Sequence, residues 1–173
     1  MRQGRGDGFR EFAEGRAGRL YRSACLLTSG DTHLAEDLVQ ETLGRMYVKW
    51  GRISRIDNPA AYAQAVLVRA FLTHRRRRSA GERPVGGFPE PGTAAAGGAA
   101  TDPELRLTLL QALGRLPPKD RAVLVLRYWE DRSVEETADA MNVSPAAVRT
   151  RTTRALARLR EQLGGSPAAF AEL

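Results

Sequence analysis

Apolar residues recur at helical spacing along most of the chain, in two stretches separated by a break without any such pattern. The first stretch has apolar positions three to four apart from Phe9 to Leu27, and a second such run from Ala35 to Trp50. The other stretch begins with a run from Leu105 to Leu116, and strand-type alternation is not sustained in either stretch. The pattern predicts an all-α protein.

The break runs from Ser79 to Thr101 and is rich in glycine, proline and alanine. Such composition predicts a flexible linker over 79–101, and an irregular loop docked on one domain is the alternative. We therefore expect two small helical domains, at 9–78 and 102–163, joined by this linker. The tail 164–173 is expected to fray.

Capping residues mark expected helix starts in both stretches. A side chain suited to an N-cap stands before each expected helix, often with proline next to it; these signals are Asp31, Asn58-Pro59, Asp102-Pro103, Ser133 with Glu136, and Ser144-Pro145. The third helix of the first stretch is expected at 59–78. Ser133 and Glu136 have the spacing of a capping box.

Residues 133–163 form the most informative part of the sequence. A short capped helix is followed by Asn142-Val143 and then by a longer capped helix, which is the helix-turn-helix layout. Asn142 suits the turn because asparagine tolerates left-handed backbone angles. In this motif the second helix enters the major groove of DNA.

The outward face of that second helix carries arginine and threonine. At 100° per residue, Val148, Ala155 and Leu159 fall on the inner side. Arginine and threonine reach base edges and phosphates, so the candidate DNA contacts are Ser144, Arg149, Thr150, Arg151, Thr153, Arg154 and Arg158. A solvated basic face is the alternative.

Composition agrees with a nucleic-acid partner. The chain has 27 Lys+Arg against 20 Asp+Glu, a formal net charge of +7, which also suits a ribosomal or membrane-surface protein. No apolar run approaches the roughly 20 residues that span a bilayer, so we expect a soluble cytoplasmic protein without membrane insertion.

Enzymatic and metal chemistry find no support in the sequence. Cys25 is the only cysteine, which excludes an intrachain disulfide and a cysteine-based zinc cluster; we interpret it as a buried small hydrophobe, with a reactive thiol as the alternative. His33 and His74 stand far apart without a framework of other ligands. We expect no catalytic residues, no metal and no cofactor.

The helix over Ala35–Trp50 has an acidic outer face that includes Asp37, Gln40 and Glu41. Asp37 and Glu41 stand four apart, a spacing that places like charges side by side. Acids near a helix N-terminus are often only solvated. The other interpretation is a docking ridge for a basic protein surface, with Gly44 allowing close approach.

The third helix ends in four consecutive arginines. Such a run favours phosphate, and aromatic residues beside arginines suit single-stranded DNA. We interpret Phe71 as core, and Arg69 and His74 as exposed. The candidate contacts are Tyr62, Arg69, His74, Arg75, Arg76, Arg77 and Arg78.

Three segments resemble the extracytoplasmic-function (ECF) sigma factors of bacterial RNA polymerase. Ala35–Trp50 resembles their region 2.2, Leu113–Trp129 their region 4.1 and Ser133–Leu159 their region 4.2. The likeness is greatest to the actinobacterial SigE-type subgroup. Leu43, Arg69 and Thr153 depart from residues common in the family, where phenylalanine, asparagine and a larger side chain are frequent.

The resemblance implies a sigma factor that binds core RNA polymerase, at the β′ clamp and the β flap, and directs it to promoters. Asp37, Leu38, Gln40 and Glu41 would then dock on the clamp helices of β′. The third helix would meet the −10 element, and the last helix would read the −35 element. The linker would thread toward the active-site cleft of the polymerase.

An anti-sigma factor is a further partner that the family resemblance suggests, although the sequence shows no site for it. Such a partner would clamp the two domains together and hide both DNA-binding faces. The alternative function is a stand-alone helix-turn-helix regulator that binds operator DNA. Such a regulator has no use for an acidic ridge, an arginine-ended helix and a long linker.

Overall fold

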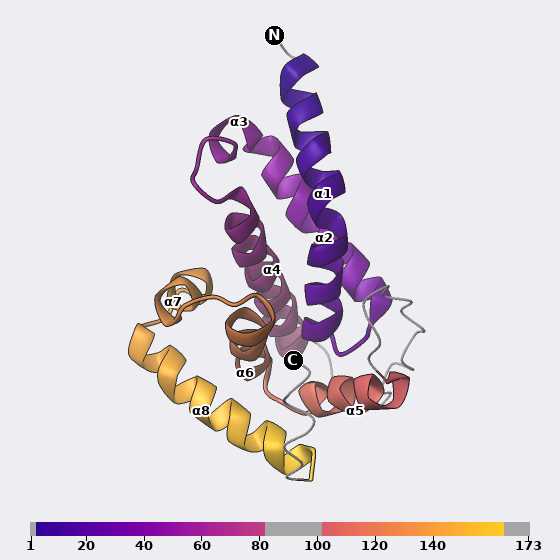
Figure 1. The fold of residues 1–173 in the computed structure, drawn as a ribbon, viewed down its shortest axis with the longest axis vertical. Coiled ribbons are helices and arrows are strands. Elements are labelled where there is room, and N and C mark those ends of the chain that lie inside the picture. The colour runs from indigo at the N-terminus through magenta and orange to yellow at the C-terminus, as the bar shows by residue number, and fades with distance from the viewer. Residues whose placement is uncertain (1–2, 82–101, 165–173) are drawn as a thin grey trace.

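The computed structural model describes residues 3–81 and 102–164, and these form helices joined by turns (Figure 1). The first part contains α1 (Gln3–Leu27), α2 (Thr32–Val48), α3 (Trp50–Ile53) and α4 (Pro59–Gly81). The second contains α5 (Pro103–Gly114), α6 (Pro118–Leu124), a π-helical turn η1 (Val125–Trp129), α7 (Val134–Met141) and α8 (Pro145–Gln162). No strand occurs in these two parts, so the all-α prediction is confirmed.

The expected helix starts are confirmed by hydrogen bonds at the caps. Asp31 accepts from the backbone N–H of Leu34, and Ser144 from that of Ala147. Ser133 and Glu136 form the predicted capping box. Each cap satisfies a backbone donor that the first helical turn leaves unpaired.

The helices differ from the expectations in four places. Helix α1 begins at Gln3, before the expected domain start, and the short helix α3 was not expected. Helix α4 continues to Gly81, into the segment expected to be a linker, while 82–101 and the tail 165–173 lie outside the described residues. Residues Val125–Trp129 form a wide π turn, closed by the N–H of Glu130 bonding to the carbonyl of Val125 at 2.9 Å.

Helices α1, α2 and α4 pack as a bundle around buried apolar side chains such as Leu27, Met46 and Leu67. Rings stabilise the end of the bundle near α3, because Phe9 and Phe12 of α1 lie 5.4 and 5.0 Å from Trp50, measured between ring centroids. Trp50, the first residue of α3, is 7% exposed against these rings.

The second part packs directly on the first. Helices α6 and α7 lie against α4. Helix α8 packs on α6 and α7 and runs along the outer edge of the molecule (Figure 1). Val123 and Leu126 are buried in the same core as Phe71 of α4. A smaller core lies between α5, α6 and α8 around Leu116 and Leu159. The two halves, expected as separate domains, therefore share one apolar core.

Polar contacts fix how the halves meet. The Glu130 carboxylate, buried at the end of η1, accepts from the Ser23 hydroxyl at 2.5 Å and from Nε of Arg19 at 3.2 Å. Arg121 of α6 is 2% exposed, and its guanidinium donates to the carbonyl oxygens of Leu27, Gly114 and Leu116. Buried donors and acceptors that find partners in this way make the packing specific.

Candidate nucleic-acid and polymerase interface

Helices α7 and α8 form a helix-turn-helix with the predicted turn. Asn142 adopts the left-handed conformation, with φ of 56°, and Val143 N–H bonds to the carbonyl of Ala138 at 3.0 Å. The backbone N–H of Ser133 donates to the Glu136 carboxylate and holds the pKa of that carboxyl below its usual range. The turn fixes the direction in which α8 leaves α7.

Helix α8 has a buried face and an exposed face, as its periodicity predicts. Val148, Ala155 and Leu159 are at most 1% exposed. Thr150, Thr153, Arg154 and Arg149 are exposed on the other side, and Arg149 lies 3.5 Å from Glu135 of α7 in an exposed ion pair. This face offers two guanidinium groups and two hydroxyl groups to a partner.

Two other arginines of α8 are already paired with a buried carboxylate of the protein. Arg151 and Arg158 donate to the two carboxylate oxygens of Asp120 at 2.8 and 2.7 Å. Asp120 is 3% exposed, at the start of α6, and sequence reasoning missed it. In the sequence Asp120 is an acid between Lys119 and Arg121, and nothing there points to its two partners on α8. Ser144 has a local role as the cap of α8.

The four consecutive arginines, Arg75 to Arg78, lie in the last turns of α4 near the surface. Arg76, Arg77 and Arg78 are exposed and Arg75 is half-buried. Burial lowers the pKa of Arg75, and the neighbouring charge of Arg78 lowers it further. A hollow of about 500 Å³ lies beside the run, lined by His74, Arg77, Arg78 and Gly81. Crowded positive charge of this kind favours a polyanion.

The other α4 residues expected to contact DNA are placed differently from the expectation. The Arg69 side chain reaches α7, where Nε donates to the carbonyl of Ala140 and an Nη to that of Asp139, both at 2.8 Å. His74 is half-buried rather than exposed, and its Nε2 has no hydrogen-bond partner among the described residues. Tyr62 is half-buried against the core, and Phe71 is fully buried as expected.

The acidic face of α2 is exposed, apart from Leu38. Asp37, Gln40 and Glu41 lie at the surface, and Glu41 pairs with Arg45 one turn later. Leu38 is 2% exposed and packs in the core, and its expected docking on a partner stays a prediction. A Cβ added to Gly44 would meet nothing within 4 Å, so its surface is open to a partner.

Other chemistry is not supported by the described residues. They contain no group of three His, Cys, Asp or Glu side chains that could hold a metal ion. Cys25 is 3% exposed, and burial raises the pKa of its thiol, as expected of a small core residue. None of the helices described is long and apolar enough to span a bilayer.

The two halves each match a known family. Residues 15–81 match Sigma-70 region 2, and residues 106–159 match Sigma-70, region 4. The RNA polymerase sigma-E factor of Streptomyces coelicolor is 38% identical over 155 residues, which cover 90% of this chain and 85% of that protein.

The chain belongs to the sigma-70 family. It is of the ECF type, and ECF RNA polymerase sigma factor SigL of Mycobacterium tuberculosis is 32% identical over 146 residues, covering 82% of this chain and 80% of that protein. The expected resemblance to the sigma-E subgroup is confirmed, since the sigma-E factor of Streptomyces avermitilis is 37% identical over 90% of this chain and 84% of its own length.

Solved structures share the fold of the sigma factor. The sigma factor RpoE of Bartonella quintana, in complex with the anti-sigma factor NepR, matches with a TM-score of 0.73 and 24% identity over 91% of this chain and 97% of that one. CnrH, in complex with the cytosolic domain of CnrY, matches with a TM-score of 0.62 and 21% identity, over 91% and 88% of the two chains. The protein is an RNA polymerase sigma factor, and a stand-alone regulator is not favoured.

Proposed function

We propose that this sigma factor uses three surfaces: the α2 ridge (Asp37, Gln40 and Glu41) for the β′ clamp of polymerase, the end of α4 for the −10 element and the exposed face of α8 for the −35 element. It acts by positioning, in the cytoplasm, and leaves the chemistry to polymerase. The observation that carries the proposal is that all three surfaces are exposed on helices whose opposite faces are buried.

The −35 contacts are assigned to Arg149, Thr150, Thr153 and Arg154. Arginine can donate two hydrogen bonds to guanine, and threonine can donate to a phosphate or a base. We leave Arg151 and Arg158 out of the base-reading set, because Asp120 already accepts from both. The rigid capped turn before α8 holds these side chains in fixed register.

The −10 contacts are assigned to the arginine run, Arg75 to Arg78, with His74 beside it. The charge supports binding of the DNA backbone, since each neutralised phosphate releases counterions. Tyr62 and Arg69 remain part of this proposal, with the added condition that α7 must first release Arg69, whose donors bind its carbonyl oxygens.

Promoter binding therefore requires the two halves to separate. The −10 and −35 elements lie roughly 25 base pairs apart, which is about 85 Å of duplex at ~3.4 Å per base pair. Helices α4 and α8 both pack on α7, and packed helices lie about 8–10 Å apart between axes, so where they pack on α7 the axes of α4 and α8 are within about 20 Å of each other. The packed arrangement is a closed state that cannot span both elements.

An anti-sigma factor is proposed as a partner of this closed state. The titles of the two similar structures describe sigma factors bound by NepR and by CnrY. A partner that holds α4 against α7 would keep Arg69 bound to the α7 carbonyl oxygens. It would thereby prevent the separation that promoter binding needs.

Charge reversal on the α2 ridge tests the polymerase assignment. The double variant Asp37→Lys with Glu41→Lys should lose binding to core polymerase, because like charges would then face a basic clamp surface. Both side chains are exposed, so folding should be unaffected. Glu11→Lys with Glu14→Lys, an equal charge change on the exposed face of α1, is the matched control and should bind normally. Unchanged affinity of the ridge variant would refute the assignment.

A further inference from the structure

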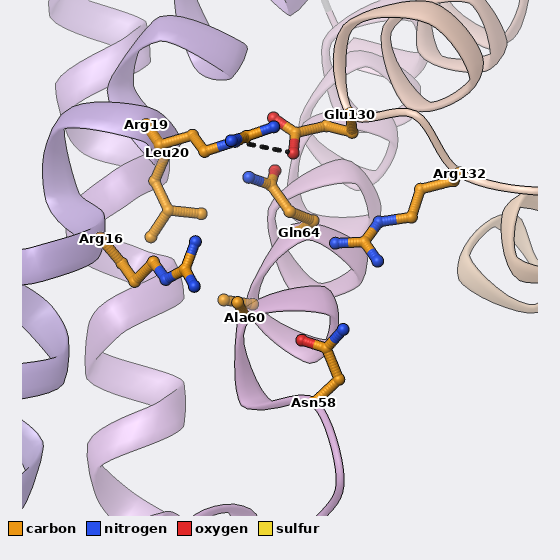
Figure 2. Close-up of a pocket in the computed structure, with 9 residues that line it drawn as sticks. Arg16, Arg19, Leu20, Asn58, Ala60, Gln64, Glu130 and Arg132 are labelled. Atoms are coloured by element: carbon orange, nitrogen blue, oxygen red, sulfur yellow. Dashed lines mark hydrogen bonds and ion pairs between the residues drawn. The ribbon is translucent and has the colours of Figure 1, made fainter.

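A polar cavity of about 160 Å³ lies where the two halves meet. Its walls come from α1 with Arg16 and Arg19, from the start of α4 with Asn58 and Gln64, and from the segment between η1 and α7 with Glu130 and Arg132. Figure 2 shows Arg16 and Arg132 entering from opposite sides, with their guanidinium groups directed toward the space between them.

The lining is rich in hydrogen-bond donors. Three arginines face one carboxylate, and that carboxylate already accepts from Arg19 and from Ser23. Positive charge in the cavity is therefore not balanced by its own walls. Guanidinium groups bind phosphoryl oxygens in paired, planar geometry, which a small inorganic anion can match.

One donor of the lining is left without a partner among the described residues. The Nε of Arg132 is buried and makes no hydrogen bond there, although an Nη of the same side chain lies 3.8 Å from Glu136. Gln64 is 5% exposed and places a polar side chain in the same lining. Buried donors usually have partners, so the Nε of Arg132 points to a bound group.

We propose that this cavity is a binding site for a small phosphoryl anion, of the size of pyrophosphate, held by Arg16, Arg132 and Gln64. A cavity of this volume has room for about five water molecules at ~30 Å³ each, and it falls below the roughly 300 Å³ of sites that enclose whole organic ligands. The anion is either free, or it is the terminal phosphoryl group of a nucleoside diphosphate that reaches in from outside.

Occupation would favour the closed state, because the walls come from both halves and a ligand stabilises the arrangement that it binds. This consequence rests on the proposed opening for promoter binding. Pyrophosphate should then weaken the binding of promoter DNA by the sigma factor together with core polymerase. If it binds the sigma factor without weakening promoter binding, the proposed opening is wrong while the site stands.

Calorimetric titration of the full chain with sodium pyrophosphate, in buffer matched for ionic strength with sodium chloride, tests the site. Saturable binding at one site is expected. Gln64→Glu, which keeps the size of the side chain and adds a negative charge, should abolish it, and Arg16→Ala should weaken it by about tenfold or more. Arg16 is exposed, so this variant should fold normally.

Arg10→Ala is the matched control, because it removes one exposed arginine from the same helix outside the cavity. Its affinity for pyrophosphate should equal that of the wild type. A parallel titration with a nucleoside diphosphate separates the two sources: tighter binding of that ligand identifies the nucleotide, and weaker binding the free anion. No saturable binding, or an equal loss in Arg10→Ala and Arg16→Ala, would overturn the proposal.

Discussion

Arg121 donates a hydrogen bond of 2.5 Å to the main-chain oxygen of Leu27, although 94 residues separate the two in the sequence. The same guanidinium lies 5.8 Å from the ring centroid of Phe71, within reach of a cation–π contact. One arginine thus joins the end of α1, the middle of α4 and the start of the helix-turn-helix half. This contact is central to the closed state.

Arg121→Met should lower the free energy of unfolding by about 1–3 kcal/mol, because it leaves the carbonyl oxygens of Leu27, Gly114 and Leu116 without their donor. Burial lowers the pKa of Arg121 to about 10, with the charge of Arg75 adding to the effect, so the residue is still charged at pH 7. Chemical denaturation measures the loss. Arg115→Ala, at an exposed site, should change stability by less than about 0.5 kcal/mol, and equal losses in the two variants would contradict the account.

Gly114→Ala should destabilise the contact between the halves by about 1–3 kcal/mol. A Cβ at this position would lie 2.4 Å from the Ser29 Oγ, whose hydroxyl donates to the carbonyl of Leu110 at 2.6 Å. At Gly18 of α1 an added Cβ meets nothing within 4 Å, so Gly18→Ala should stabilise the helix by about 0.5–1 kcal/mol. Thermal unfolding of both variants checks the opposite signs, and a stabilised Gly114→Ala variant would refute the close approach.

Ser23 and Glu130 should show coupled effects on stability, because the hydroxyl of Ser23 donates to the buried Glu130 carboxylate. A double-mutant cycle with Ser23→Ala and Glu130→Ala measures this coupling in denaturant. A value of about 1–3 kcal/mol is expected for a buried hydrogen bond to a charged group. Additive effects would show that the two halves do not meet through this pair in solution.

Arg154→Ala should weaken binding to a cognate −35 element by about 1–3 kcal/mol, if its guanidinium reads a base, and should leave stability unchanged. Arg151→Ala gives the contrasting case: it removes one donor to Asp120 and should cost about 1 kcal/mol of stability with little change in promoter preference. Promoter binding and denaturation, measured on both variants, separate the two roles. An equal loss of Arg154→Ala binding on every DNA sequence would make Arg154 a phosphate contact.

Local features of this fold could be predicted from the sequence, because they depend on neighbours along the chain. The caps Asp31, Ser133 and Ser144 each act on a backbone N–H three residues later. The turn at Asn142 and the buried face of α8 follow from similarly short-range rules.

The contacts between the halves could not be predicted in this way. Asp120 and Glu130 are buried against partners 31 or more residues away, and Arg121 bonds to Leu27 94 residues away. No periodicity reveals such partners. Arg69 shows the consequence most plainly: its charge suggested an exposed DNA contact, whereas the carbonyl oxygens at the end of α7 accept from it. Leu38 belongs to the apolar run between Ala35 and Trp50 and is buried in the core, whereas its docking role came from the family resemblance alone.

The most direct test of the account is to add the purified protein to core RNA polymerase and transcribe a library of promoters. We predict tight binding and initiation from a limited set of promoters that share −10 and −35 sequences, with both lost in the Asp37→Lys and Glu41→Lys double variant. Failure to bind polymerase, together with nanomolar binding of the protein alone to duplex DNA, would contradict the assignment of this chain's surfaces.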